Sequence, residues 1–213
     1  MSREAADNAL LQRRPELRVC AAQIEAAQEA LVAIFSRGNR LLLCGNGGSA
    51  ADCEHIAGEL LKSFEKARPL SEDLRVRLAA QGPEGERLAA RLERAFPALA
   101  LTGHLSFATA FANDVAPELV FAQLVQALGG SGDGLLVLTT SGDSENVVLA
   151  ARTARAMEMA VIGLTGGSGG VLAQLCDACI IAPGDGTAEI QESHRAIYHH
   201  LCRELENHFF PEQ

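Results

Sequence analysis

Hydrophobic and polar positions alternate along this chain in blocks that predict short buried strands separated by helices. Short apolar runs rich in leucine, valine and isoleucine are typical of strands buried on both faces of a parallel sheet. The predicted strands lie at 40–44, 98–102, 134–139, 160–164 and 178–182. Apolar residues at helical spacing predict helices at about 50–64, 107–113, 117–128, 145–157, 169–175 and 187–209. This alternation predicts an α/β fold in which helices cover both faces of a parallel sheet.

Two segments depart from the alternation. A long helical pattern spans 3–36, with Pro15 as a kink or a break near its start. Segment 65–96 is rich in charge and contains Gly-Pro-Glu-Gly at 82–85, so we expect one or two surface helices there. This insertion is one of three alternatives: a flap near a site, a subunit contact or a solvent-exposed insertion without a specific role. We expect one domain over 1–213.

Composition narrows the possible partners and compartments. Hydrophobic residues make up 48% of the 213 residues, and the net charge is −9 without a block of lysine and arginine, which disfavours nucleic acid as a partner. The polar segment after Met1 does not read as a signal peptide, and no apolar run near 18 residues predicts a membrane span. Six scattered cysteines then indicate reduced thiols in a cytoplasmic protein. Cys176 and Cys179 form a lone C-x-x-C, which we interpret as small core residues.

The segment 40–60 carries the strongest candidate chemistry. A predicted strand breaks into Gly45-Asn46-Gly47-Gly48-Ser49, and a helical pattern follows at once. Glycines there let backbone N–H groups approach an anion or a sugar hydroxyl. His55 and Glu59 are four residues apart, which places an imidazole and a carboxylate on one face of that helix. We therefore expect chemistry on a small, polar, anionic substrate.

A second candidate loop combines hydroxyl groups with a helix N-terminus. Thr139, Thr140, Ser141 and Ser144 surround the turn between a strand and the helix that begins near Glu145. Hydroxyls, backbone N–H groups and the helix dipole together suit a phosphate, although Ser144 is alternatively only an N-cap. Asp143 would repel a phosphate, so we expect it to point outward.

Other glycine-rich and polar stretches are less specific. The run 165–170 follows a strand and is alternatively a ligand contact or a flexible turn. Neither a dinucleotide-binding fingerprint nor a P-loop is present, which disfavours NAD and ATP. The last predicted helix concentrates polar groups at Gln191, Glu192, His194, His199 and His200. Gln191 and His199 are about 12 Å apart along that helix, so spacing alone does not pair them.

Several motifs in order resemble the bacterial phosphoheptose isomerases. They are CGNGGSAADCEHIAGEL, AFANDVAPELVFAQLVQALG, TTSGDSENV, VIGLTGGSGG and IQESHRAIYHHLCRELE, and they cover nearly the whole chain except 65–96. The resemblance implies a single sugar-isomerase (SIS) domain with a five-stranded parallel sheet in a flavodoxin-like three-layer sandwich. It also implies a homotetramer with sites between subunits, and composition adds the expectation of a cytoplasmic protein without a nucleic-acid or membrane partner.

The resemblance further implies an activity and a set of site residues. The activity is interconversion of sedoheptulose 7-phosphate and D-glycero-D-manno-heptose 7-phosphate, the entry to the heptose of lipopolysaccharide and related glycans. The implied zinc ligands are His55, Glu59, Gln191 and His199, and Glu59 and His199 are also the implied acid–base pair. The implied substrate-binding residues are Asn46, Gly47, Gly48, Ser49, Asp114, Thr139, Thr140, Ser141, Ser144 and Gln191.

The implied chemistry agrees with the residue types. An aldose–ketose isomerase moves a proton between C1 and C2 through an enediol, so it needs a base at carbon and an acid at oxygen. The phosphate loop reads TTSGDS instead of the more usual STSGNS, and segment 65–96 is long, so another phosphosugar is an alternative substrate. A non-catalytic phosphosugar-binding protein, or a scaffold that binds the replication initiator DnaA, is the alternative class.

Overall fold

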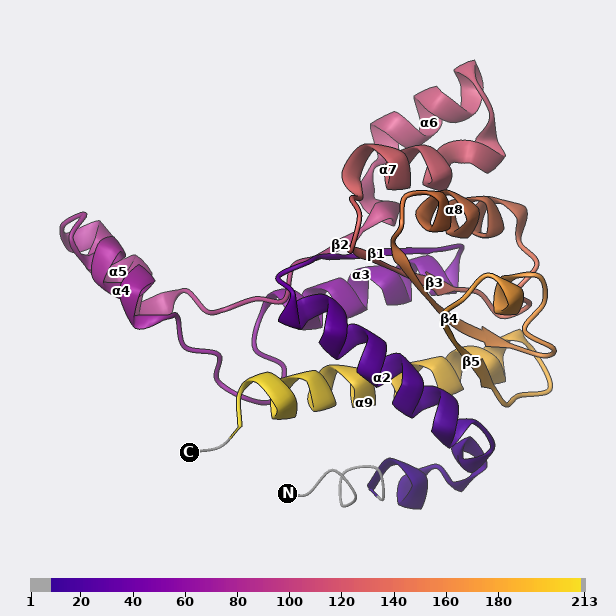
Figure 1. Cartoon of the computed structure of the whole chain (residues 1–213), viewed down its shortest axis with the longest axis horizontal. Helices are drawn as coiled ribbons and strands as arrows, with labels where there is room; N and C mark the ends of the chain where they lie inside the picture. The colour runs from indigo at the N-terminus through magenta and orange to yellow at the C-terminus, as the bar shows by residue number, and fades with distance from the viewer. Residues whose placement is uncertain (1–8, 212–213) are drawn as a thin grey trace.

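The computed structural model describes residues 9–211, in which strands and helices alternate much as the hydrophobic pattern predicts (Figure 1). The strands are β1 (Leu41–Gly45), β2 (Ala98–Ala100), β3 (Gly134–Leu138), β4 (Ala160–Gly166) and β5 (Ala178–Ala182). The α-helices are α2 (Ala21–Ser36), α3 (Gly48–Leu61), α4 (Glu72–Ala79), α5 (Pro83–Arg91), α6 (Leu105–Asp114), α7 (Val120–Leu128), α8 (Glu145–Ala156) and α9 (Thr187–Phe209). Short 3-10 helices are η1 (Pro15–Cys20), η2 (Leu101–Gly103), η3 (Pro117–Leu119) and η4 (Leu172–Gln174).

The described residues form one parallel sheet of five strands in the order β2-β1-β3-β4-β5. Every strand therefore ends at the same edge of the sheet. The chain order reverses at β1, which pairs with β2 on one side and β3 on the other, and Gly45 lies beside Leu138. The loops after β1 and β3 leave the sheet next to each other at this switch point, where α/β folds commonly bind ligands.

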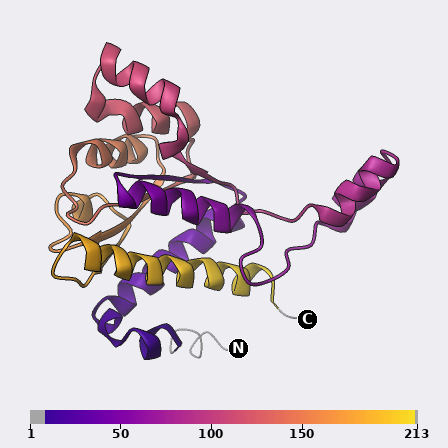
Figure 2. The same ribbon diagram turned by 180° about the vertical axis from the view of Figure 1, so that it is seen from behind.

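Helices cover both faces of the sheet, which confirms the predicted three-layer α/β fold (Figures 1 and 2). Successive residues of a strand point to opposite faces. Leu41 and Leu43 pack in a core with α2, α3 and α9, whereas Leu42 and Cys44 pack in a second core with α7 and α8. The apolar run of β1 is therefore continuous because both of its faces are buried.

The N-terminal helical segment is interrupted near Pro15, which is one of the two alternatives that the sequence left open, a kink or a break. A helical turn ends before Arg14, η1 follows from Pro15, and α2 begins at Ala21. Proline lacks a backbone N–H and disfavours helical geometry in the residue before it, which accounts for the break. Residues 3–8 of the predicted helix lie outside the described residues.

The same segment contradicts the expectation that no apolar stretch of this chain approaches the length of a membrane span. In length and composition, Pro15–Ser36 is apolar enough to cross a membrane. In the structure, however, Leu17, Ile24 and Leu31 are buried in the core with α9 and the sheet. We therefore interpret this segment as a core helix of the domain.

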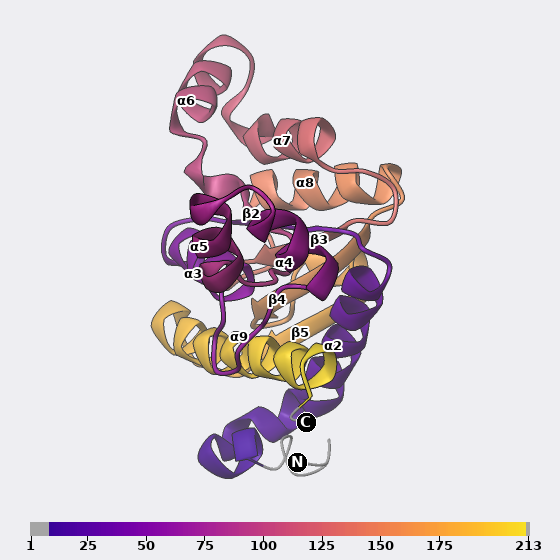
Figure 3. The same ribbon diagram turned by 90° about the vertical axis from the view of Figure 1, so that its left-hand side faces the viewer.

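The insertion 65–96 contains a helical hairpin, α4 and α5, that projects from the body of the molecule (Figures 1 and 2) and points toward the viewer in Figure 3. Its helices α4 and α5 bury almost nothing: α4 has no buried residue, and α5 has only Gly85. A Cβ at Gly85 would lie 1.9 Å from the carbonyl oxygen of Leu78, so glycine permits the close packing of the two helices.

The helix predicted over 169–175 is wrong. The chain there forms a turn followed only by the 3-10 helix η4. Gly169 and Gly170 have φ angles of +81° and +55°, which a right-handed helix does not allow. The apolar residues of this segment therefore pack into the core from a turn and the short helix η4, and their helix-like spacing does not reflect an α-helix.

Candidate active site

The loop after β1 has a backbone that requires glycine. Gly47 has a φ of +54° and lies at the N-cap of α3, and a Cβ at Gly45 would lie 2.9 Å from the carbonyl oxygen of Leu138. Asn46, Gly47 and Gly48 are exposed, whereas Ser49 is buried. The predicted sugar-binding loop therefore offers accessible backbone at the carboxyl edge of the sheet.

The loop after β3 places its hydroxyl groups in and around a tight turn. Thr139 Oγ1 accepts a hydrogen bond from the N–H of Gly142 at 3.4 Å, and Ser141 Oγ accepts one from the N–H of Asp143 at 3.2 Å. Ser144 occupies the N-cap position of α8 but makes no side-chain capping hydrogen bond. Its hydroxyl group therefore does not serve as the cap in this structure, and the N-terminus of α8 follows the turn directly.

The third glycine-rich run, residues 165–170, and the residues that follow it pack against this turn. Asp143 Oδ1 accepts a hydrogen bond from the N–H of Val171 at 2.9 Å, and the N–H of Leu172 donates to the carbonyl of Gly142 at 3.0 Å. A Cβ at Gly142 would lie 2.0 Å from the carbonyl oxygen of Gly169. Asp143 is thus engaged by the segment after β4, which gives it a structural partner.

One residue that sequence reasoning missed joins the two loops. Asn46 and Asn146 exchange a reciprocal pair of amide hydrogen bonds, at 2.8 and 2.9 Å. Asn146 lies two residues after Ser144, and its position in the TTSGDSEN turn is the only signal in the sequence. The pair fixes the loop after β1 relative to the first turn of α8.

His55, Glu59 and His199 gather where α3 packs beside α9. His55 Nε2 lies 3.3 Å from Glu59 Oε1, one helical turn along α3, and 3.1 Å from His199 Nε2 of α9. Glu59 Oε2 also contacts Nζ of Lys62 at 3.1 Å. The Glu59 side chain is 16% exposed and that of His55 is 44% exposed, so the cluster faces solvent through His55.

Aromatic side chains surround His199. Phe64 stacks on its ring with centroids 5.6 Å apart, and the ring of Tyr198 meets it edge-on at 4.7 Å. Tyr198 in turn donates a hydrogen bond to the buried Asp52 of α3 at 3.0 Å. Burial lowers the pKa of His199, and the nearby imidazole of His55 lowers it further, while Glu59 opposes this effect. A neutral imidazole, which can bind a metal or exchange a proton, is therefore favoured at His199.

Gln191 lies at the other end of this helix pair. A Cβ at Gly48 would lie 2.6 Å from Nε2 of Gln191, so the amide covers the start of α3, whereas His199 lies beside His55 further along. α3 and α9 therefore run in the same direction. Within the described residues, no three histidine, cysteine, aspartate or glutamate side chains are arranged to hold a metal ion. His55 is close to both Glu59 and His199, but as they stand the three side chains do not converge on one point.

Asp114 is not brought to the other candidate residues within this chain. It ends α6, which packs against α7 and η3 on the opposite side of the sheet from α3 and α9 (Figure 1). Its carboxylate accepts a hydrogen bond from Asn113 at 2.8 Å.

Two other candidate groups have structural roles. His194 is fully buried, and its Nε2 lies 3.1 Å from the carbonyl oxygen of Thr165. Burial lowers the pKa of His194, as expected for a neutral core histidine. Cys176 and Cys179 are free thiols that pack over Gly163, where a Cβ would lie 2.7 Å from the Cys176 sulfur.

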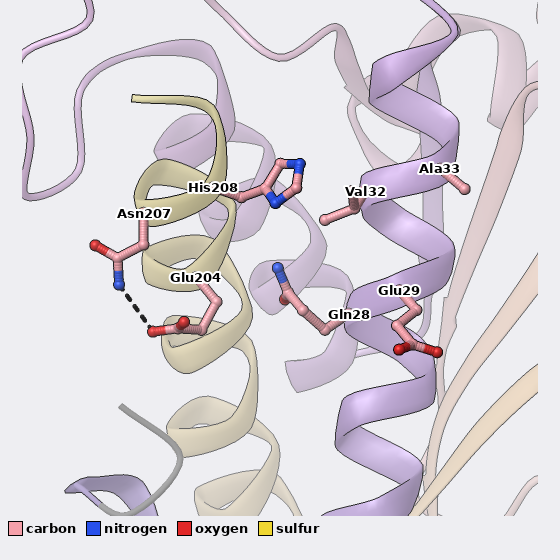
Figure 4. A pocket seen from close by; sticks show the side chains of 7 residues that line it. All are labelled: Gln28, Glu29, Val32, Ala33, Glu204, Asn207 and His208. Atoms are coloured by element: carbon pink, nitrogen blue, oxygen red, sulfur yellow. Dashed lines mark hydrogen bonds between the residues drawn. The ribbon is translucent and has the colours of Figure 1, made fainter. Parts of the chain in front are cut away.

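A cavity of about 350 Å³ lies between α2 and α9, away from these clusters (Figure 4). Gln28 and Val32 of α2 line one side, and Glu204 and His208 of α9 line the other. It contains none of the candidate site residues, so the cavity does not mark the catalytic position.

Comparison with known proteins shows that the chain is similar to SIS-domain proteins and, among them, to phosphoheptose isomerases. The SIS domain profile matches residues 10–95 and 88–166. A phosphoheptose isomerase from Roseiflexus sp. is 40% identical over 200 residues, covering 94% of this chain and 89% of that protein. A phosphoheptose isomerase from Thiobacillus denitrificans is 43% identical over 185 residues, covering 85% and 81%. The solved phosphoheptose isomerase from Francisella tularensis has a TM-score of 0.72 at 32% identity, covering 97% of this chain and 100% of that one.

Proposed function

We propose that this chain, which belongs to the phosphoheptose isomerase family of SIS-domain proteins, uses Glu59 and His199 to isomerise sedoheptulose 7-phosphate. Its product is D-glycero-D-manno-heptose 7-phosphate, the aldose from which heptose for lipopolysaccharide and related glycans is made. The observation that carries the residue assignment is the meeting of Glu59 and His199, through His55, where α3 packs beside α9.

Two proton transfers define the mechanism. Glu59 removes the proton from the carbon next to the carbonyl and returns it to the neighbouring carbon of the enediol. His199 passes the second proton between the oxygens on C1 and C2. The lowered pKa of His199 suits this shuttle because a neutral imidazole has both a donor and an acceptor nitrogen.

The two loops at the switch point orient the substrate. Thr139, Thr140, Ser141 and Ser144, with the N-terminus of α8, form the proposed phosphate site. Asn46, Gly47, Gly48 and Ser49 form the proposed sugar site, and Gln191 lies over Gly48 from α9. The Asn46–Asn146 pair would keep these two sites at a fixed separation, which aligns the reacting carbons with Glu59.

We also propose that His55, Glu59, Gln191 and His199 hold one zinc ion. Their nitrogen and oxygen atoms suit zinc, and ligand atoms of a tetrahedral site with bonds of about 2.1 Å lie about 3.4 Å apart. The separations of 3.1 and 3.3 Å around His55 are close to that spacing. Gln191 would have to swing away from Gly48 to join them. When bound, the ion would supply Lewis-acid stabilisation of negative charge on the sugar oxygens.

Replacing His55 with glutamine should lower the zinc content of the purified protein by at least about tenfold, because an imidazole central to the proposed site is lost. The measurement is metal content by inductively coupled plasma mass spectrometry after dialysis against zinc. His208→Gln, an exposed change on α9, is the matched control and should retain zinc. Equal zinc in both variants would exclude His55 as a ligand.

We propose a homotetramer with sites at subunit interfaces. The helix α6 supports this because it has no buried residue although it carries Phe107 and Phe111, and Leu105 beside them is 74% exposed. Asp114, distant from α3 and α9 within one chain, would then act in a neighbouring subunit's site. Light scattering should give a mass near that of four chains of 22.5 kDa each, whereas a monomer mass would contradict the assembly.

We place the protein in the cytoplasm. The six cysteines are free, and four of them are buried in the core, where a thiol is compatible with a reducing compartment.

The decisive experiment for the activity is proton NMR of sedoheptulose 7-phosphate with the zinc-loaded protein in D₂O. New aldose signals and exchange of the proton on the reacting carbon are expected. Neither conversion nor exchange, with a folded and zinc-loaded protein, would favour another phosphosugar or a binding role.

A further inference from the structure

Two buried charged residues join the elements that carry Glu59 and His199. Arg68 and Glu206 both have fully buried side chains, and Arg68 Nε donates to Glu206 Oε1 at 2.8 Å. Glu206 is on α9, the helix of His199, and Arg68 follows α3, the helix of Glu59. Burying two charges is costly unless their hydrogen bonds are satisfied, so their other partners show what the pair holds.

Arg68 binds the end of α3. Its Nη1 donates to the carbonyl of Leu60 at 2.6 Å, and its Nη2 donates to the carbonyl of Glu59 itself at 2.9 Å. Carbonyls in the last turn of a helix lack partners within the helix, and a cation there also interacts favourably with the helix dipole. The guanidinium thus fixes the backbone of the proposed catalytic base.

Glu206 binds the loop that follows α3. Its carboxylate accepts hydrogen bonds from the backbone N–H groups of Phe64, Glu65 and Lys66 at 2.8, 2.8 and 3.0 Å. These hydrogen bonds fix the backbone at Phe64, whose ring stacks on His199. One buried pair therefore contacts the backbone of the proposed base and holds the ring that packs on the proposed acid.

We propose that Arg68 and Glu206 are positioning residues that fix Glu59 relative to His199 across the α3–α9 contact. This inference rests on the proposed function of those two residues. The base and the acid come from helices far apart in sequence, and misplacement by about 1 Å can cost about a hundredfold in rate. The Arg68–Glu206 pair connects α3 rigidly to α9, which the two exposed loops do not do.

The test is Arg68→Lys in the zinc-loaded full chain. Lysine keeps the charge beside Glu206, but one ammonium group cannot reproduce the planar guanidinium bonds to a carboxylate and two carbonyls. We expect kcat per folded protein to fall at least about tenfold while KM changes less than about threefold, because Arg68 contacts the last turn of α3, whereas the proposed sugar loop lies at the start of that helix. The ring protons of His199, assigned with His199→Gln, should shift in the NMR spectrum as the stacked Phe64 moves.

Val125→Ala is the control for a merely structural role. Val125 is fully buried in the core on the opposite face of the sheet, so its truncation lowers Tm without touching α3 or α9. It should leave kcat per folded protein and the His199 resonances unchanged. A normal kcat and unmoved His199 resonances in Arg68→Lys would overturn the proposal.

Phe64→Leu provides a second test if Arg68→Lys does not fold. It leaves the buried pair intact and removes only the ring against His199, so kcat should fall and the His199 resonances should move. Unchanged values for both would overturn the proposal. If the unmodified protein lacks isomerase activity, the proposed function fails, whereas the His199 resonances still report whether the pair positions that ring.

Discussion

Replacing Glu59 with glutamine should reduce kcat for sedoheptulose 7-phosphate by about a hundredfold or more. The amide is nearly the same size as the carboxylate but cannot accept the carbon proton. The fold should survive, because among the described residues the Glu59 carboxylate pairs with His55 and the exposed Lys62, and the hydrogen bond from Arg68 uses the backbone carbonyl of Glu59. Proton NMR in D₂O measures both turnover and exchange at carbon.

Glu54→Gln is the matched control for that change. Glu54 is also on α3 but is exposed, and its carboxylate accepts a hydrogen bond from Thr102 at 3.0 Å. It should retain normal turnover. Normal turnover and exchange in a folded Glu59→Gln protein would exclude Glu59 as the base, and a similar loss in both variants would point to a general effect of charge on α3.

Replacing Glu206 with alanine should destabilise the protein by about 3–5 kcal/mol. The change leaves the guanidinium of Arg68 buried without its carboxylate, and it removes the acceptor of three backbone N–H groups. For a chain of this size, each kcal/mol corresponds to roughly 2–4 °C in Tm, so a loss of about 10 °C is expected. Urea unfolding followed by circular dichroism gives the free energy of unfolding.

A nearby surface pair supplies the comparison. Glu65 pairs with Arg203 of α9, but both side chains are partly exposed, so Glu65→Ala should cost less than about 1 kcal/mol. A Glu206→Ala protein that loses no more stability than Glu65→Ala would show that the buried pair does not hold the loop to α9.

Much of the fold was predictable because local patterns determine it. Short continuous apolar runs bounded by glycine or threonine, such as 134–139, favour buried strands of a parallel sheet, and Gly47 marks a turn that other residues would strain. The predicted helix at 169–175 failed because apolar spacing does not register the positive φ angles of Gly169 and Gly170.

The candidate site was predictable only in part. Spacing along α3 places His55 next to Glu59, but nothing local connects either of them to His199, which lies 144 residues after His55. The resemblance to known isomerases named these residues together, and the structure adds that Gln191 covers Gly48 at the other end of the helix pair.

The sequence by itself determined the order of strands and helices, the two ligand-type loops and the types of chemical group available to the site. Only the tertiary structure decided which groups meet: Asn46 with Asn146, His55 with His199, and Arg68 with Glu206. The physical reason is the separation along the sequence of the residues that interact. Secondary structure and turns follow from neighbouring residues, whereas these contacts depend on the packing of α3 against α9 and on the pairing of β1 with β3.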